Sequence, residues 1–342
     1  MSDQMQRVVL ASRPNGAPTA DNFRLETSAL PIPGPEEVLV KLHYMSLDPY
    51  MRGRMDDAKS YAAPVPVGGT MEAGAVGEVI ASNSPVFKPG DFAFGMFGWV
   101  SHGCLPASQL QKLDPNHGPI TAALGVLGMP GLTGWFGLNE YGKPKAGETL
   151  VVAAATGPVG SMVGQLAKRA GLRTVGIAGG ADKCGLAVET FGFDACLDHR
   201  AYNDAAALRT ALEATCPHGI DIYYENVAGK VLEAVLPLMN DFGRIPVCGM
   251  ISYYGGAKGA DADLTAPMIW RTVLVKFLSV QGFIIMNHFD RHPEFLKEIG
   301  PLVANGEIRY LEDIAKGLES APAAFMAMLE GGNMGKQIVK LV

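Results

Sequence analysis

The order of apolar and polar positions divides the chain into two regions of different texture. Up to about residue 124, short apolar runs such as 37–42 and 75–80 lie between segments rich in proline and glycine, which are turn signals. Many short strands separated by turns are typical of a compact, barrel-like β domain. We therefore predict a β-rich domain at the start of the chain.

The pattern changes near residue 128, where apolar strands begin to alternate with helical periodicity. The predicted strands cover residues 149–153, 174–178, 195–197, 220–224, 244–248 and 279–283. Helices are predicted between them, for example over 159–170 and 231–238. Six strands that alternate with helices predict an α/β domain built on a doubly wound parallel sheet.

The last part of the chain returns to a mixed pattern after about residue 300 and ends in the apolar run 337–342. This run is suited to rejoin the sheet of the first domain. We therefore assign residues 1–127 and 300–342 to one domain and residues 128–299 to the other.

Composition narrows the classes of function. The chain has 342 residues, 48% of them hydrophobic, and a net charge of -6, so a basic surface for nucleic acid or anionic membrane is not expected. Neither a secretory signal at the start nor an apolar run of about 18 residues is present in the sequence. The cysteines at positions 104, 184, 196, 216 and 248 form no C-x-x-C pair, which favours free thiols in the reducing cytoplasm.

The strongest chemical signal is a glycine-containing turn between a predicted strand and a predicted helix. Ala155, Gly157 and Gly160 occupy the three small-residue positions of a G-x-G-x-x-G pattern. At Gly157 the backbone is able to approach a pyrophosphate, and Gly160 and Gly164 allow close packing of helix and sheet. The pyrophosphate would lie at the N-terminus of the helix, so the turn predicts a dinucleotide site.

The end of the second strand of this domain indicates which dinucleotide is bound. NAD-dependent proteins usually have an acidic residue there, whereas this chain has Gly179 and Gly180, followed by Lys183. Two glycines leave room for a 2′-phosphate and a lysine is able to pair with it, so we predict NADPH. Asp182 argues against this choice unless it only caps the next helix. His199, after the third strand, is a further candidate for the same phosphate.

Several motifs in order resemble one known family. They are the segments 48–53 (DPYMRG), 127–131 (LGMPG), 153–160, 178–180, 224–227 (YENV) and 332–336 (GNMGK). Together they resemble the zinc-independent medium-chain dehydrogenases/reductases, within them the leukotriene B4 dehydrogenase/prostaglandin reductase and double-bond reductase group, and especially its bacterial curcumin-reductase branch. The resemblance covers essentially the whole chain.

The resemblance implies a GroES-like β-rich substrate domain made from both chain ends, a Rossmann domain between them, and usually a homodimer. The cofactor contacts implied by it or by the glycine motifs are Met129, Thr133, Gly157, Pro158, Val159, Gly160, Gly179, Gly180, Lys183, Asn226, Cys248, Tyr254, Phe283 and Asn333. His199 stands where other members have a tyrosine. The segments that carry zinc ligands in zinc-dependent relatives, here 46–49 and 68–71, contain no cysteine or histidine.

The implied reaction is reduction of the activated C=C bond of an α,β-unsaturated ketone or aldehyde. Hydride addition to the β-carbon leaves negative charge on the carbonyl oxygen, so the site needs a hydrogen-bond donor and a proton source. Tyr254 is the first candidate and Tyr61 the second, although a ribose hydroxyl of the cofactor could also serve. Further candidates for contact with the substrate are Tyr50, Trp99, Met286 and His288. Arg52 and Arg54 are interpreted as ion pairs of the fold.

Three other functions remain open. A quinone oxidoreductase of the same superfamily would share the glycine turn, and a catalytically silent NADPH-binding regulatory module would share the cofactor site. Oxidation of allylic alcohols is a third reading. The glycine-rich segment 255–259 is also a candidate lid.

Overall fold

The computed structural model describes residues 4–254 and 265–342, and the candidate lid 255–259 lies outside them. The chain forms two units. One comprises Met1–Gly128 and Glu312–Val342, and the other comprises Met129–Leu311.

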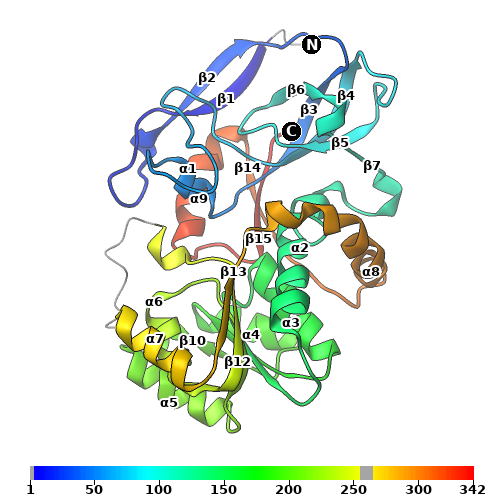
Figure 1. The fold of residues 1–342 in the computed structure, drawn as a ribbon. Coiled ribbons are helices and arrows are strands. Elements are labelled where there is room, and N and C mark those ends of the chain that lie inside the picture. Colours follow the sequence, from blue (N-terminus) through cyan, green and yellow to red (C-terminus); the bar gives the residue numbers. More distant parts are fainter. Residues whose placement is uncertain (1–3, 255–264) are drawn as a thin grey trace. The chain divides into compact units, whose positions relative to one another are not determined.

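The first unit is built mainly on antiparallel strands from both parts of the chain, with β14 and β15 paired in parallel. Its larger sheet has the order β14-β15-β3-β4-β5-β7, with β6 also paired to β3 (Figure 1). The strands are β3 (Glu37–Ser46), β4 (Ala75–Ser82), β5 (Phe92–Gly95), β6 (His102–Pro106), β7 (Gln111–Leu113), β14 (Glu312–Lys316) and β15 (Lys336–Lys340). A separate ribbon pairs β1 (Gln4–Leu10) with β2 (Phe23–Ala29). Because β15 pairs with β3, the expectation that the final apolar run rejoins the first sheet is confirmed.

The core of the first unit surrounds an aromatic cluster. Trp99 is fully buried, stacks on Phe23 at 5.6 Å between ring centroids, and meets Phe325 of α9 (Ala321–Leu329) edge-on. The assignment of Trp99 to the substrate-contacting residues is therefore corrected. Its apolar ring is removed from water by packing within the unit, which leaves it no surface for a ligand.

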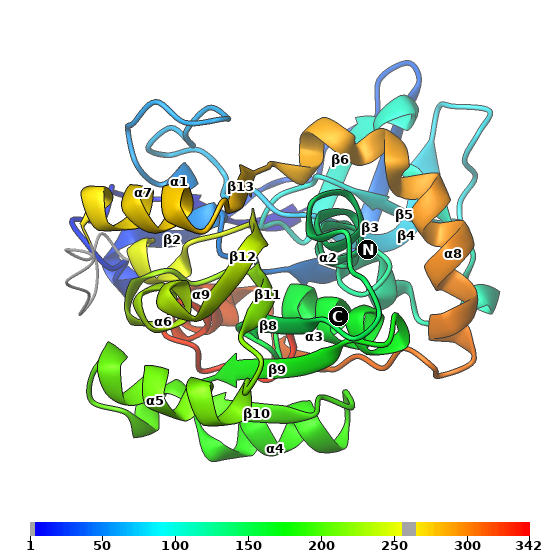
Figure 2. The same cartoon turned by 60° about the horizontal axis from the view of Figure 1, so that its bottom comes forward.

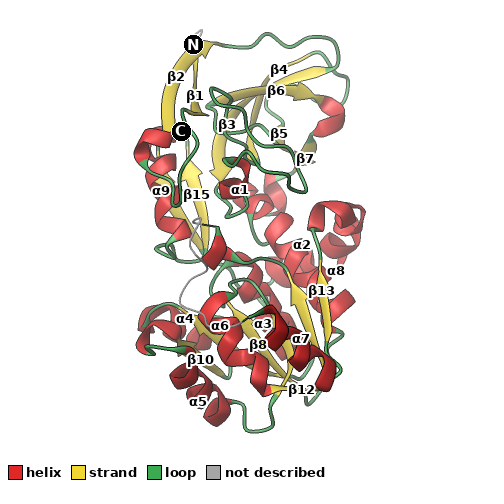
Figure 3. Cartoon of the chain, turned by 60° about the vertical axis from the view of Figure 1, so that its left-hand side comes forward, coloured by secondary structure: helices red, strands yellow, loops and turns green. Residues whose placement is uncertain are grey.

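The second unit is a six-stranded parallel sheet in the order β10-β9-β8-β11-β12-β13 (Figure 2). The strands are β8 (Thr149–Ala153), β9 (Arg173–Ala178), β10 (Ala195–Asp198), β11 (Ile220–Tyr224), β12 (Met239–Val247) and β13 (Ser279–Gly282). The helices that separate them are α3 (Pro158–Arg169), α4 (Ala181–Glu189), α5 (Ala205–Thr215), α6 (Gly229–Val235) and α7 (Ala266–Val275), as Figure 3 shows by colour. The predicted α/β fold with a parallel sheet is thus confirmed, strand by strand.

Two details differ from the predicted elements. The helix expected over 231–238 ends as α6 at Val235 and continues as a tighter 3-10 turn, because Pro237 cannot donate the next helical hydrogen bond. β12 starts five residues before the predicted strand, at Met239, and passes through Phe242, whose φ of 62° is left-handed.

The second unit extends beyond the expected boundary at residue 300. Helix α8 (His292–Ala304) belongs to it, together with α2 (Met129–Phe136). Phe295 packs against Trp135 at 5.9 Å between ring centroids, and the Trp135 indole donates to Glu298 at 3.0 Å. These contacts hold α8 to the second unit, so the chain re-enters the first unit at Glu312.

Candidate functional site

The glycine turn after β8 is as tight as the sequence pattern requires. Ala154 has a φ of 53°, and Gly157 precedes the first residue of α3, Pro158. A Cβ atom at Gly160 would lie 2.3 Å from the Ala154 carbonyl oxygen, and one at Gly164 would lie 1.9 Å from the Phe193 ring. Only glycine is compatible with these approaches.

The start of α3 is suited to an anion. The helix has 12 residues, and the N–H groups of its first turn, including that of Val159, have no partner earlier in the helix. No side chain caps this end, and Gly157 leaves the backbone open. A diphosphate fits this place because helix N-termini carry partial positive charge.

A second set of groups gathers where β9 ends, at Gly179 and Gly180. Asp198, at the end of β10, accepts hydrogen bonds from the Gly180 N–H at 2.7 Å and the Arg200 N–H at 2.9 Å. A Cβ atom at Gly179 would lie 2.9 Å from Arg200 Nε and 3.1 Å from His199 Nε2. The side chains of His199 and Arg200 therefore lie directly against the glycine pair.

Arg200 was missed by the sequence reasoning. The signal that would have found it is its position beside His199, directly after the third strand of the sheet. The N–H of Arg200 is held by Asp198, which aims the residue back toward Gly179.

The charges around the glycine pair are mainly positive. Burial lowers the pKa of His199, and the neighbouring cations Lys230, Arg200 and Lys183 lower it further against an opposing effect of Asp198. Lys230 is engaged in the fold, because its ammonium group donates to the carbonyl oxygens of His199 and Tyr202 at 3.0 and 2.8 Å. Asp182 lies in the first turn of α4, where the helix dipole favours an acid.

The ends of β8, β11 and β12 place a third group of predicted residues. The side-chain amide of Asn226 donates to the Ala153 carbonyl oxygen at 2.8 Å, and the backbone carbonyl oxygen of Asn226 accepts from the Ile251 N–H. Burial raises the pKa of the Cys248 thiol to about 12, so this group stays uncharged. The structure therefore brings Asn226 and Cys248 to the carboxyl edge of the sheet, where ligands bind in open α/β sheets.

Helix α2 contributes Thr133 to the same unit. Its hydroxyl donates to the Met129 carbonyl oxygen at 2.7 Å, and its own carbonyl oxygen accepts from the Tyr224 hydroxyl at 2.7 Å. Phe283 is buried against Phe136 and Tyr141. The hydroxyl of Thr133 is thus already used within its own helix.

The remaining predicted residues of the second unit are more exposed. The hydroxyl oxygen of Tyr254 accepts from the Met250 N–H at 3.3 Å. His288 stacks on Phe136 at 4.3 Å between ring centroids, whereas Met286 is exposed.

The first unit holds the other predicted residues. Tyr50 and Tyr61 both contact the guanidinium group of Arg54, at 5.5 and 4.4 Å from the respective ring centroids. Burial raises the pKa of Tyr50 well above its usual range, with further contributions from Asp48 and Glu72, so its hydroxyl remains a donor. The Asn333 side chain donates to the Gly335 carbonyl oxygen at 2.8 Å.

A buried ion pair joins the two parts of the chain in the first unit. Lys336 donates to Asp48 Oδ1 at 2.6 Å and to the Leu47 carbonyl oxygen at 2.7 Å, and the Ser46 hydroxyl donates to the other carboxylate oxygen of Asp48. All three side chains are almost fully buried. This arrangement fixes the backbone that leads into Tyr50.

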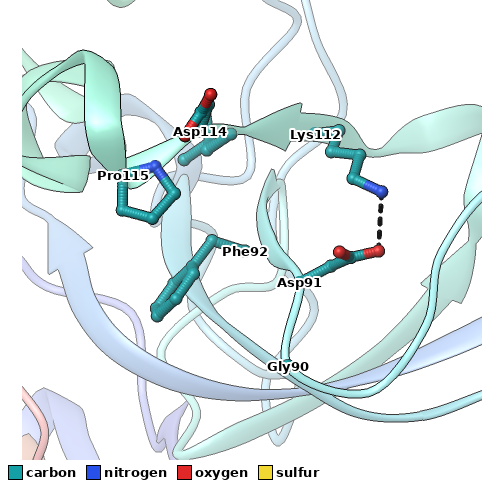
Figure 4. A pocket seen from close by; sticks show the side chains of 7 residues that line it. Gly90, Asp91, Phe92, Lys112, Asp114 and Pro115 are labelled. Carbon is teal, nitrogen blue, oxygen red and sulfur yellow. Dashed lines mark hydrogen bonds and ion pairs between the residues drawn. The ribbon is translucent and has the colours of Figure 1, made fainter.

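A surface hollow of about 340 Å³ also lies in the first unit. Figure 4 shows its lining, which includes Phe92, Pro115 and the ion pair between Asp91 and Lys112. None of the predicted site residues lines it. In the part of the chain that the structure describes, no three His, Cys, Asp or Glu side chains gather as a metal site would need. No helix among the described residues is long and apolar enough to cross a membrane.

Comparison with known proteins agrees with both units. Residues 6–113 match the family described as "N-terminal domain of oxidoreductase", and residues 158–300 match the one described as "Zinc-binding dehydrogenase". The chain is 49% identical to the NADPH-dependent curcumin reductase of Escherichia coli over 337 residues, which cover 98% of this chain and 96% of that protein. It is 38% identical to the 2-alkenal reductase of Nicotiana tabacum over 339 residues, with 98% and 96% covered.

Solved structures give the same result. A crystal structure of CurA from Vibrio vulnificus in complex with NADPH matches with a TM-score of 0.92 and 46% sequence identity, covering 98% of this chain and 99% of that one. The identity and the coverage extend over both units. The chain therefore belongs to the medium-chain dehydrogenase/reductase family.

Proposed function

We propose that this protein uses NADPH to reduce the activated C=C bond of α,β-unsaturated ketones and aldehydes. The observation that carries the proposal is similarity along nearly the whole chain to reductases of conjugated alkenes. They include the curcumin and 2-alkenal reductases and the (+)-pulegone reductase of Mentha piperita, which is 36% identical over 342 residues.

The residues of the second unit fit the proposed cofactor. The first turn of α3, with Gly157 and Val159, would hold the pyrophosphate, and Lys183, His199 and Arg200 would pair with the 2′-phosphate beside Gly179. Asn226, Cys248 and Phe283 are proposed for the nicotinamide half, with Met129 and Thr133, and Asn333 stays a cofactor candidate by resemblance. When bound, NADPH supplies the hydride that the β-carbon of the substrate accepts.

The protein's own part in the reaction is to stabilise charge and deliver a proton. Negative charge builds up on the carbonyl oxygen of the enone, and a phenol O–H donor stabilises it without carrying charge itself. We propose Tyr254 or Tyr61 for this donor and Tyr50 for a wall of the substrate site. The support for Tyr254 is its place in the loop after β12, because ligands of open α/β sheets bind at the carboxyl ends of the strands.

The proposed reaction needs no zinc. At the segment where zinc-dependent relatives are expected to carry a cysteine ligand, this chain has Ser46–Pro49, and Asp48 is committed to a buried ion pair with Lys336. A carboxylate held in this way is not presented to a metal ion.

We further propose that the protein is a cytoplasmic homodimer that pairs through the second unit. β13 is an edge strand of the described sheet, and the neighbouring α7 exposes Trp270 at 65% and Leu274 at 75%. Phe242 and Phe277 stack on each other nearby and are also exposed. Monomeric proteins seldom leave a large apolar patch beside an unpaired strand edge.

Light scattering after size-exclusion chromatography tests the dimer. The wild type is expected at twice the mass of one chain, and Trp270→Glu with Leu274→Glu is expected to shift it toward the monomer. A wild-type monomer at high protein concentration would disprove the dimer.

Absorbance of NADPH tests the reaction itself. Enones, enals, a curcumin-type diketone and quinones are supplied in turn with NADPH and with NADH, and the products are identified by mass spectrometry. Saturated ketone or aldehyde as product, with NADPH preferred, supports the proposal. Turnover of quinones alone, or tight NADPH binding without any turnover, contradicts it.

A further inference from the structure

The short helix α1 (Met51–Arg54) carries two buried arginines with different surroundings. Arg52 donates to the Asp56 carboxylate at 2.7 Å and to the Gly16 carbonyl oxygen at 2.6 Å. This is an ordinary fold ion pair, as the sequence suggested for both residues. Arg54 differs, because aromatic rings form much of its environment.

The guanidinium group of Arg54 lies over the rings of two tyrosines. Its central carbon is 4.4 Å from the ring centroid of Tyr61 and 5.5 Å from that of Tyr50. Its Nε is 3.2 Å from a carboxylate oxygen of Glu72, an ion-pair distance without the alignment of a hydrogen bond. The Arg54 side chain is only 4% exposed, so the attraction of the two ring faces offsets part of the cost of burying its charge.

Tyr61 lies in an irregular part of the chain that Arg54 contacts. It is 56% exposed and lies in residues 56–63, which form neither helix nor strand. Besides the ring contact, an Arg54 nitrogen donates to the Ala62 carbonyl oxygen at 3.5 Å, and the Val65 N–H donates to the Arg54 carbonyl oxygen at 2.8 Å. The Arg54 side chain therefore contacts this irregular segment at Tyr61 and Ala62, and its backbone carbonyl holds Val65 just beyond it.

The charge of Arg54 also acts on Tyr50. Burial, Asp48 and Glu72 raise the pKa of Tyr50, and Arg54 alone among the named neighbours opposes them. A cation beside a phenol favours negative charge on its oxygen and so makes the O–H a better hydrogen-bond donor.

We propose that Arg54 is a positioning residue for the reduction: it holds the rings of Tyr50 and Tyr61 in one arrangement for the enone. The proposal rests on the function proposed above, because it assigns these two tyrosines to the substrate. Arg54 itself transfers no proton. It acts through the tyrosines, and its loss frees the Tyr61 segment while leaving the cofactor residues of the second unit in place.

Steady-state kinetics of Arg54→Met and Arg54→Lys test the proposal, with Arg52→Lys as the matched control on the same helix. We expect kcat/KM for the enone to fall about tenfold in Arg54→Met, which is the effect of a cation–π contact worth about 1.4 kcal/mol. The KM for NADPH is expected to stay unchanged. Arg54→Lys is expected to recover only part of the loss, because an ammonium group lacks the planar face that stacks on the rings. Arg52→Lys is expected to behave as the wild type.

Fluorine NMR of protein labelled with 3-fluorotyrosine gives a readout that does not depend on turnover. The Tyr61 signal, assigned by its absence in Tyr61→Phe, is expected to move toward that of an exposed tyrosine in Arg54→Met and to stay in place in Arg52→Lys. In a double-mutant cycle, Arg54→Met is expected to cost much less activity when Tyr61 is already phenylalanine.

Two results would overturn the proposal. One is a folded Arg54→Met or Arg54→Lys protein with an unmoved Tyr61 signal and wild-type kcat/KM. The other is full additivity of Arg54→Met and Tyr61→Phe. A wild-type protein that turns over no enone would instead refute the proposed function, and the NMR comparison would still decide whether Arg54 holds Tyr61.

Discussion

Removal of the cations beside Gly179 should change the preference for NADPH over NADH. The perturbation is Arg200→Ala, Lys183→Ala and the two together. Arg200 is placed by the hydrogen bond from its N–H to Asp198, and its Nε would be 2.9 Å from a Cβ atom at Gly179. A 2′-phosphate above the glycine pair would meet this guanidinium group, whereas the 2′-hydroxyl of NADH would not.

The magnitude follows from the exposure of the site. Two unit charges 4 Å apart interact by about 1 kcal/mol in bulk water and about 4 kcal/mol at the effective dielectric constant near a protein surface. Arg200 is exposed and Lys183 is half-buried, so the interaction of each cation with the 2′-phosphate should lie near the lower end of this range, at about 1–2 kcal/mol. We expect each single variant to raise the KM for NADPH roughly 5–30-fold, since a change of 1–2 kcal/mol corresponds to such a factor.

The assay is the ratio of kcat/KM for NADPH to that for NADH with one enone. Lys168→Ala is the matched control, because it removes the same charge from the same unit but pairs with Asp194 at the surface. Higher salt should weaken NADPH binding to the wild type more than to the double variant. The reasoning is refuted if kcat/KM falls equally for NADPH and NADH, or if the double variant keeps the wild-type ratio of the two kcat/KM values.

Three further predictions concern pH and stability. Because the pKa of His199 is lowered, its ring is neutral near pH 7, and a fall in pH through that pKa adds a positive charge beside Gly179. The affinity for NADPH, measured by fluorescence titration, should therefore rise relative to that for NADH as pH falls. In His199→Gln this rise should be lost, and only the pH dependence that comes from protonation of the 2′-phosphate itself should remain. In urea titrations, Gly160→Ala should lower the free energy of unfolding by about 1–3 kcal/mol, because its Cβ atom would overpack against the Ala154 backbone. Gly185→Ala in α4 should instead raise it by about 0.5–1 kcal/mol, because a Cβ atom there meets nothing within 4 Å. In the same titrations, Lys336→Met should lower the free energy of unfolding by about 3–5 kcal/mol, because it leaves the buried Asp48 carboxylate without its cation. Addition of Asp48→Asn should recover part of that loss. An unchanged midpoint for Lys336→Met would contradict the role of the pair.

The cofactor turn was accessible from the sequence because it is local. The apolar strand before it, the small residues at 155, 157 and 160 and the helix after it lie within about 20 residues, and backbone sterics alone demand small side chains there. The inner strands β8, β9 and β11 of the second unit were also found by pattern, since strands buried on both faces read as continuous apolar runs.

Contacts between distant residues could not be read in this way. The pair of Asp48 and Lys336 joins residues 288 apart in sequence, and it depends on β15 pairing with β3 in one register. Trp99 looked like a ligand contact but is core, because the distant Phe23 and Phe325 cover its ring. Burial of one side chain is decided by neighbours that its own segment does not contain.

The sequence by itself thus determined the α/β fold of the second unit, the glycine turn and the choice of candidate residue types. The tertiary structure alone decided that Arg200 lies against Gly179 and that Arg54 lies over the rings of Tyr50 and Tyr61. The physical reason is that periodicity and turn chemistry act over a few residues. Where a side chain in a turn or irregular segment lies, as those of Arg200 and Tyr61 do, depends on the backbone path of that segment, which no periodic pattern describes.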